Sequence, residues 1–140
     1  MADWIGFALG SAAFAGLTAI LAKIGVGAIP SNLATLIRVA VVLAFTLLLV
    51  SLRHEWPQPG QLGPRSVTFL VLSGLTTGLS WLCYHRALQS GPVSLVSPID
   101  KLSLTVAVLL AVLLLGERLQ MRQWFGVGLM TAGALLLVVR

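Results

Sequence analysis

The chain has 140 residues, of which 58% are hydrophobic and only 9% are charged, and its mean hydropathy is +1.00. A soluble domain carries roughly 25% charged residues, so a surface as apolar as this one would associate in water. The net charge of +5 does not indicate nucleic-acid binding, because the basic residues stand singly between apolar runs and form no stripe. The composition therefore predicts an integral membrane protein without a soluble catalytic domain.

Five segments meet the length of about 20 apolar residues that a transmembrane helix needs. They cover approximately residues 4–26, 32–52, 66–88, 93–115 and 123–139. Ser31 or Asn32 suits the N-cap of the second span. The polar stretch 53–65, with three prolines and two glycines, predicts a loop before the third span. The fold class predicted is an all-α integral membrane protein with about five transmembrane helices in a single domain.

The basic residues are divided evenly between the two sides of the membrane that these spans define. One side has Arg53, Arg65, Arg118 and Arg122, the other has Lys23, Arg86, Lys101 and Arg140, and Arg38 lies deeper in the second span. Because an excess of Lys and Arg in cytoplasmic loops sets orientation, the absence of an excess predicts insertion in both orientations. Two copies would then form an antiparallel homodimer. The alternative, that one loop or a partner fixes a single orientation, stays open.

Two basic residues lie well inside predicted spans, which is costly in a bilayer unless they face a protein interior or a water-filled cavity. Arg38 is about 9 Å into the second span, and Lys101 is about 12 Å into the fourth. With Lys23 and Arg86, and with Asp100 as the acid on that side, they predict a positively biased vestibule. Alternatively, Lys23 and Arg86 extend to the interface, and Asp100 neutralises Arg38 or Arg86. Adjacent residues of a helix do not face each other, so Asp100 and Lys101 are not expected to pair.

Pro98 lies within the fourth span, close to these charges. Proline removes a helical hydrogen bond, so Pro98 predicts a helix break that frees carbonyl groups at membrane depth. Irregular backbone at that depth is tolerated where it is buried in protein or lines water, and interrupted helices are common substrate sites. The alternative is a helix that simply begins at Pro98.

Three side chains share one face of the third span, namely Trp81, Tyr84 and His85. They predict either the wall of a binding cavity or an aromatic belt at the interface, since Arg86 follows directly. The cavity is favoured for Trp81 and Tyr84, and the belt is favoured for His85.

Small residues recur at the spacing of helix contacts, as in the GxxxG pairs 6/10 and 74/78. Packing within the chain is a more common explanation than dimerisation. The sequence contains no nucleophile–base pair, phosphate loop or metal-ligand spacing. It therefore predicts that the protein is not an enzyme and uses no cofactor or metal.

The order and spacing of these segments resemble the EamA domain of the drug/metabolite transporter superfamily. The resemblance is carried by AILAKIGVGAIPSNLATLIR in the first half, and by YHRALQSGPVSLVSPIDKLS, LLLGERL and WFGVGLMTAGALLLV in the second. Most members of that family consist of two such five-helix domains in tandem, with opposite orientations. The family moves small metabolites, amino acids and drugs. A chain with one domain is thus implied to act as an antiparallel homodimer in the inner membrane of a bacterium or archaeon.

The related small multidrug resistance proteins bind cations and protons with an acid embedded in their first helix. Here the first span has no acid beyond Asp3 at its edge, so the vestibule favours an anionic or zwitterionic solute. The expected partners are the lipid bilayer, a second copy and a small-molecule solute, with no nucleic acid. Two alternatives remain at this stage, a non-transporting membrane scaffold and a multidrug/proton exchanger.

Overall fold

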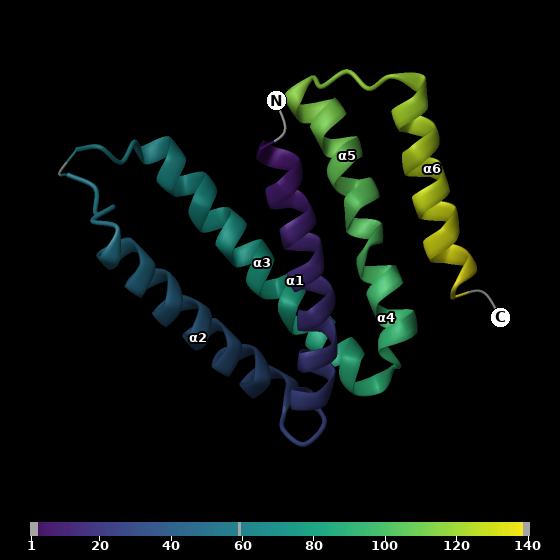
Figure 1. Ribbon diagram of the computed structural model, residues 1–140, viewed down its shortest axis with the longest axis horizontal. Helices are drawn as coiled ribbons and strands as arrows, with labels where there is room; N and C mark the ends of the chain where they lie inside the picture. The colour runs from purple at the N-terminus through teal and green to yellow at the C-terminus, as the bar shows by residue number, and fades with distance from the viewer. Residues whose placement is uncertain (1–2, 59, 139–140) are drawn as a thin grey trace. The chain divides into compact units, whose positions relative to one another are not determined.

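The protein is all-helical, as expected, in a computed structural model that describes residues 3–58 and 60–138 (Figure 1). The helices are α1 (Asp3–Val26), α2 (Ser31–Leu52), α3 (Pro64–Ser90), α4 (Val93–Asp100), α5 (Leu102–Leu115) and α6 (Met121–Leu136). No strand occurs among the described residues.

Four helical segments are long and apolar enough to cross a membrane: Trp4–Val26, Ser31–Leu52, Pro64–Ser90 and Val93–Leu115. The last of these combines α4 and α5. Helix α6 has 16 residues, or about 24 Å, so a fifth crossing stays a prediction. Its expected end at Val139, and Arg140 beyond it, lie outside the described residues.

The helices expose their large apolar side chains, as helices surrounded by lipid do. At the end of α5, for example, Leu113, Leu114 and Leu115 are each about three-quarters exposed. Among the described apolar residues only Ala19, Val26 and Leu88 are buried. The little internal burial gathers where helix ends meet, and polar contacts accompany it there.

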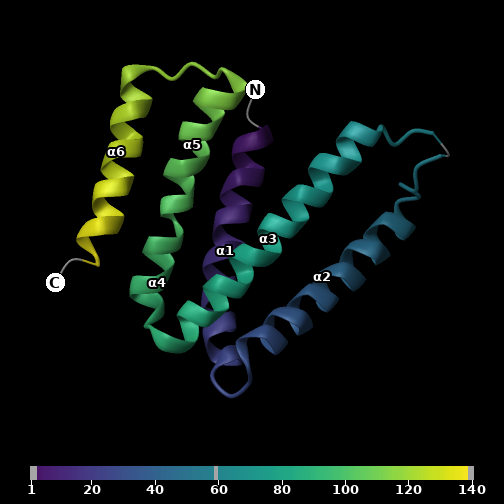
Figure 2. The ribbon, with the colours of Figure 1, turned by 180° about the vertical axis from the view of Figure 1, so that it is seen from behind.

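The chain divides into two compact units. One unit is Ile20–Gln89, which contains the end of α1 and the antiparallel hairpin of α2 and α3. The other unit combines the start of α1 with α4, α5 and α6, and its C-terminal part is a second hairpin in which α6 runs back along α4 and α5 (Figure 2).

The fourth predicted span is interrupted at Lys101, which separates α4 from α5. Pro98 lies inside α4, three residues before the interruption. The Lys101 carbonyl accepts from Leu104 N (3.0 Å), an i to i+3 bond of a tightened turn. Because α4 already begins at Val93, the alternative of a helix that starts at Pro98 is wrong.

The chain reverses between α5 and α6 through Gly116, whose φ of 69° is a left-handed conformation that glycine adopts without strain. Gln120 and Gln123 then form a reciprocal capping box at the start of α6. The hydroxyls of Thr105 and Thr131 lie 2.6 Å apart and join α5 to α6. This hairpin is therefore closed by turn chemistry and an interhelical hydrogen bond.

The predicted N-cap of α2 is wrong. Pro30 takes that position, with Ser31 as the first helical residue, and no side chain caps the helix. The reason is that the Pro30 carbonyl accepts the first helical hydrogen bond, from Ala34 N at 3.0 Å. The fixed φ of proline, here −56°, leads into the helix one residue earlier than a Ser or Asn cap would.

Within each unit, the described residues do not show the expected packing of the small-residue faces. A Cβ built on either glycine of the pair Gly6/Gly10, or of the pair Gly74/Gly78, meets no atom within 4 Å among the described residues. Among the described residues, each of these faces is therefore open within its own unit.

Candidate functional site

Several polar side chains of the unit Ile20–Gln89 gather where α2 and α3 meet near the start of α2. On α2 they are Ser31, Thr35 and Arg38, at spacings of four and three residues that keep them on one face. On α3 the same spacing connects Trp81 to His85. Since the helices are antiparallel, Thr35 meets His85 and Arg38 meets Trp81 one turn further on. The contact therefore aligns two polar pairs between two membrane helices.

Arg38 stacks on Trp81. The guanidinium carbon lies 4.3 Å from the ring centroid, and both side chains are partly buried. Such cation–π contacts contribute about 0.5–2 kcal/mol, more where water is excluded. No carboxylate of the described residues forms an ion pair with Arg38. The positive charge at this depth is thus held by an aromatic face, and no acid neutralises it there.

His85 and Thr35 form the next pair. The Thr35 hydroxyl lies 2.7 Å from His85 Nδ1 and 2.9 Å from the carbonyl of Ser31. A hydroxyl has one proton, so both contacts form together when Thr35 donates to Ser31 and His85 donates from Nδ1. His85 is only 2% exposed, so its assignment to an interfacial aromatic belt is wrong. It is buried because its position on α3 faces Thr35.

The end of α1 is tied to the end of α3 by two side chains. Lys23 donates to the carbonyl of Leu88 in the last turn of α3. Gln89 donates from Nε2 to the carbonyls of Ile29 (2.8 Å) and Val26 (3.3 Å). The bonds to Leu88 and Val26 satisfy carbonyl groups that a helix end leaves unpaired, and the bond to Ile29 satisfies a carbonyl of the turn between α1 and α2. Lys23, a predicted site residue, thus has a structural contact in this unit. The sequence analysis did not identify Gln89 or Thr35 as residues that connect helices.

In the other unit, Asp100 and Lys101 do form an ion pair, contrary to expectation. Lys101 Nζ lies 3.6 Å from Asp100 Oδ2, and the side chains are 54% and 35% exposed. The rule that neighbouring side chains point apart applies within a continuous helix, whereas α4 ends at Asp100 and Lys101 lies in the turn. At such exposure the pair contributes little stability.

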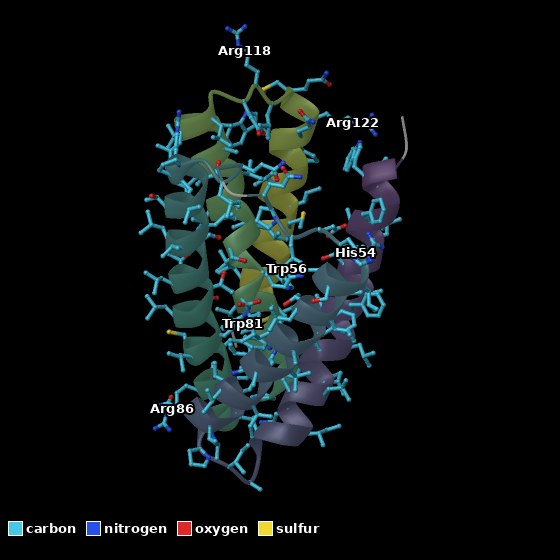
Figure 3. The ribbon with its side chains drawn as sticks, turned by 90° about the vertical axis from the view of Figure 1, so that its left-hand side faces the viewer. His54, Trp56, Trp81, Arg86, Arg118 and Arg122 are labelled. Atoms are coloured by element: carbon cyan, nitrogen blue, oxygen red, sulfur yellow. The ribbon has the colours of Figure 1, made fainter. Side chains whose placement is uncertain are left out.

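The predicted site residues are thus divided between the two units. Asp100, Lys101 and Pro98 belong to one, and Lys23, Arg38, Trp81, Tyr84 and Arg86 belong to the other. Tyr84 is partly buried, with its ring centroid 6.2 Å from that of His85. Figure 3 shows Arg86 extending away from α3 near the end of the helix, while Trp81 lies five residues earlier on the same helix. Convergence of both groups on one vestibule stays a prediction.

The described residues contain no group of three His, Cys, Asp or Glu side chains that could hold a metal ion. The α2–α3 contact instead brings together cationic, aromatic and hydroxyl groups.

Comparison with known proteins identifies the family. The model of the EamA-like transporter family matches residues 3–139. The chain belongs to this family. It is therefore a membrane transporter, and its family and relatives point away from an enzyme.

A relative from Sinorhizobium sp, named "Uncharacterized transporter in cobO 3'region", is 48% identical over 137 residues, which cover 98% of this chain and 97% of that protein. A Yersinia pestis protein is 31% identical over 83 residues, 59% of this chain and 72% of that protein. Its name is "Probable 4-amino-4-deoxy-L-arabinose-phosphoundecaprenol flippase subunit ArnE". Protein RarD of Salmonella typhi is 29% identical over 65% of this chain and 32% of that protein. No solved structure matches the chain significantly.

Proposed function

We propose that this transporter moves an anionic or zwitterionic small solute and that Arg38 supplies the positive charge that binds it. The observation that carries the proposal is the stacking of Arg38 on Trp81. Stacking occupies a face of the planar guanidinium, whereas its N–H donors lie in the plane and point outward from its edge. That edge is suited to a carboxylate or phosphate, which arginine binds through two parallel hydrogen bonds.

The location of Arg38 favours a transport role over a structural one. It lies seven residues after Ser31, about 10 Å along α2 from the start of the helix. A charge at that depth is costly unless it faces a protein interior or a polar cavity, and such residues commonly mark substrate pathways. A scaffold protein gains nothing from retaining it.

The name of the Yersinia relative supports the same class of solute. An aminoarabinose joined to undecaprenol through phosphate carries an amine and a phosphate, so it combines both signs of charge. The proposal takes from this relative only the chemical class.

The proposed active form is an antiparallel homodimer in the cell membrane. The even division of Lys and Arg between the two sides supports insertion in both orientations. An inverted pair of domains is a common basis of alternating access, and the open glycine pair on α3 offers a second copy a face for close approach.

Transport is tested with the purified full chain in proteoliposomes. Uptake of labelled glutamate, taurine and glucose 6-phosphate is compared with uptake of the cation tetraphenylphosphonium. Arg38→Gln should lower anion or zwitterion flux at least ten-fold, and Arg38→Lys should restore part of it, because Lys keeps the charge but not the planar fork.

The matched control is Arg53→Gln, since Arg53 is exposed beyond the other end of α2, beside Glu55 at 3.9 Å. Equal flux for Arg38→Gln and Arg53→Gln would reject the role of Arg38. Uptake of tetraphenylphosphonium alone would instead support a multidrug exchanger.

A further inference from the structure

His85 is a buried titratable side chain that the proposed binding of a solute by Arg38 does not use. Its ring is 2% exposed and lies between α2 and α3. The charge of an imidazole ordinarily changes near neutral pH, and histidines inside membrane proteins can serve as proton relays. Burial alone does not assign that role, because a hydrogen-bonded histidine can equally hold two helices together. The protonation chemistry of the ring and the charges around it distinguish the two roles.

The contact with Thr35 determines which ring nitrogen accepts an added proton. The Thr35 hydroxyl donates to the carbonyl of Ser31 at 2.9 Å, so its 2.7 Å contact with His85 is donated from Nδ1. A neutral imidazole carries one proton, and Nε2 is therefore the nitrogen that accepts a second. Protonation at Nε2 leaves the Nδ1–H in place and keeps the hydrogen bond between the helices. The ring can thus gain and lose a proton while α2 and α3 stay joined.

The ionisable side chains around His85 are cationic or neutral. From α2 comes Arg38, one helical turn from the contact with the ring. On α3, Tyr84 has its ring centroid 6.2 Å from that of His85, and Arg86 follows in the sequence. The end of α1 contributes Lys23, which bonds to a carbonyl in the last turn of α3. A proton on His85 would add to a positive environment.

This unit supplies no fixed acid to balance that proton. The one acid in the sequence of residues 20–89 is Glu55, which lies in the loop beyond the far end of α2. A protonated His85 and the guanidinium of Arg38 would repel each other, since like charges disfavour one another. An anionic group bound to Arg38 relieves this repulsion. By linkage, the bound anion then favours the proton and the proton favours the anion to the same degree.

We propose that His85 carries a proton together with the anionic solute, which makes this protein a proton–solute symporter. Nε2 takes a proton from water on the side where the solute binds and returns it to water on the side where the solute leaves. A singly charged anion and one proton cross together without net charge, so the membrane potential does not oppose the entry of the anion. This inference rests on the function proposed for Arg38 and adds the coupling ion to it.

The experiment follows solute and proton separately in proteoliposomes that contain the purified full chain. Labelled glutamate, taurine or glucose 6-phosphate is added outside at about pH 6.5, where imidazole ordinarily titrates. Trapped pyranine reports the internal pH, and valinomycin with equal potassium on both sides holds the membrane potential at zero. Counterflow of the labelled probe at equal pH is measured in parallel, because exchange of solute for solute moves no net proton.

In the wild type, the probe that enters should acidify the lumen, and an inward proton gradient should make that probe accumulate. His85→Asn keeps an amide donor near the position of Nδ1 but has no nitrogen that takes up a proton. Its lumen acidification should fall about ten-fold or more while counterflow stays within about two-fold, a coupling within the usual range. Circular dichroism checks the fold of each variant, and His85→Gln replaces His85→Asn if the latter does not fold.

The matched control is His54→Asn, because His54 is exposed after α2 and its φ of 53° is one that asparagine adopts readily. Both readouts should then match those of the wild type. Acidification that is equal in the wild type and in His85→Asn would overturn the role of His85. Loss of acidification and counterflow together, in folded His85 variants, would show that the residue is structural only.

The two readouts also separate this inference from the function on which it rests. Probe entry into wild-type vesicles without acidification would overturn proton coupling and leave solute transport intact. Absence of both entry and counterflow for all three probes would instead reject the solute proposed for Arg38, and the coupling with it.

Discussion

The hydrogen bond between Thr35 and His85 gives a quantitative test of what holds α2 against α3. Thr35→Val keeps the shape of the side chain but removes the hydroxyl that lies 2.7 Å from His85 Nδ1. His85 is 2% exposed, so the ring nitrogen loses its partner where water does not replace it. Leaving a buried polar group unsatisfied costs about 1–3 kcal/mol, whereas interhelical hydrogen bonds in membranes average about 0.6 and reach about 1.7 kcal/mol. We expect a loss of about 1–2 kcal/mol in the free energy of unfolding.

The chain offers a matched control for this substitution. Thr46 lies on the same helix, is exposed, and bonds only to carbonyls of its own helix, at 2.9 and 3.1 Å. Thr46→Val therefore removes a similar hydroxyl without breaking a contact between helices. Unfolding free energies of both variants are measured in bicelles by steric trapping. A difference below about 0.3 kcal/mol between Thr35→Val and Thr46→Val would refute the reasoning, since that is the usual error of additivity.

A double-mutant cycle isolates the pair itself. His85→Leu removes the buried nitrogen, so adding Thr35→Val to it no longer leaves an unsatisfied group. The double variant should be more stable than the sum of the single losses predicts, by about 1 kcal/mol. Strict additivity would show that the two side chains do not interact.

Three further outcomes are expected. Trp81→Leu should raise the KM for the transported solute about three- to ten-fold, because it frees the guanidinium of Arg38. Trp56→Leu, in the exposed loop, should leave the KM unchanged, and equal effects of both variants would contradict the stacking role. A topology reporter at the C-terminus should give signal from both sides of the membrane, and Arg118→Gln should shift the ratio of the two signals. One-sided signal in both proteins would exclude dual insertion. Gly74→Leu should lower the dimer fraction measured by fluorescence energy transfer. Monomer stability should not fall, because a Cβ at position 74 meets no atom within 4 Å. An unchanged dimer fraction would place the interface elsewhere.

The helices were predictable from sequence because four of the apolar runs are long enough to cross a bilayer, and prolines, glycines and polar residues separate the runs. Arg38 stood out as a candidate site residue for a similar reason, since a charge inside an apolar run is costly. Its partner Trp81 was identified as an aromatic group of interest, but the contact was not. Periodicity shows which residues share a face of one helix, whereas contacts between helices depend on rotation and axial register.

The errors about His85 and Thr35 have the same origin. His85 follows Tyr84 and precedes Arg86, a sequence typical of an interface, yet the register of α3 on α2 turns it toward Thr35. The sequence does not predict an interhelical contact for Thr35, because a threonine in an apolar helix usually bonds to its own backbone. A usable signal was present in the matching four-and-three spacings of polar residues on the two helices. The wrong expectation that Asp100 and Lys101 do not pair has another cause. Their pairing results from the helix interruption between α4 and α5.

The α2–α3 contact connects the proposed solute site with the proposed dimer. Along α3 the positions 74, 78, 81 and 85 follow one face, at spacings of four, three and four residues. The half of this face near the start of α2 is occupied by Arg38 and Thr35, whereas the glycine half is open among the described residues of its own unit. Apolar burial provides little attraction between helices in lipid, so polar pairs and close backbone approach decide which helices associate. The polar half therefore fixes the hairpin, and in the proposed dimer the glycine half would receive the partner one to two turns from Arg38. A second copy bound there would contribute directly to the wall of the solute site.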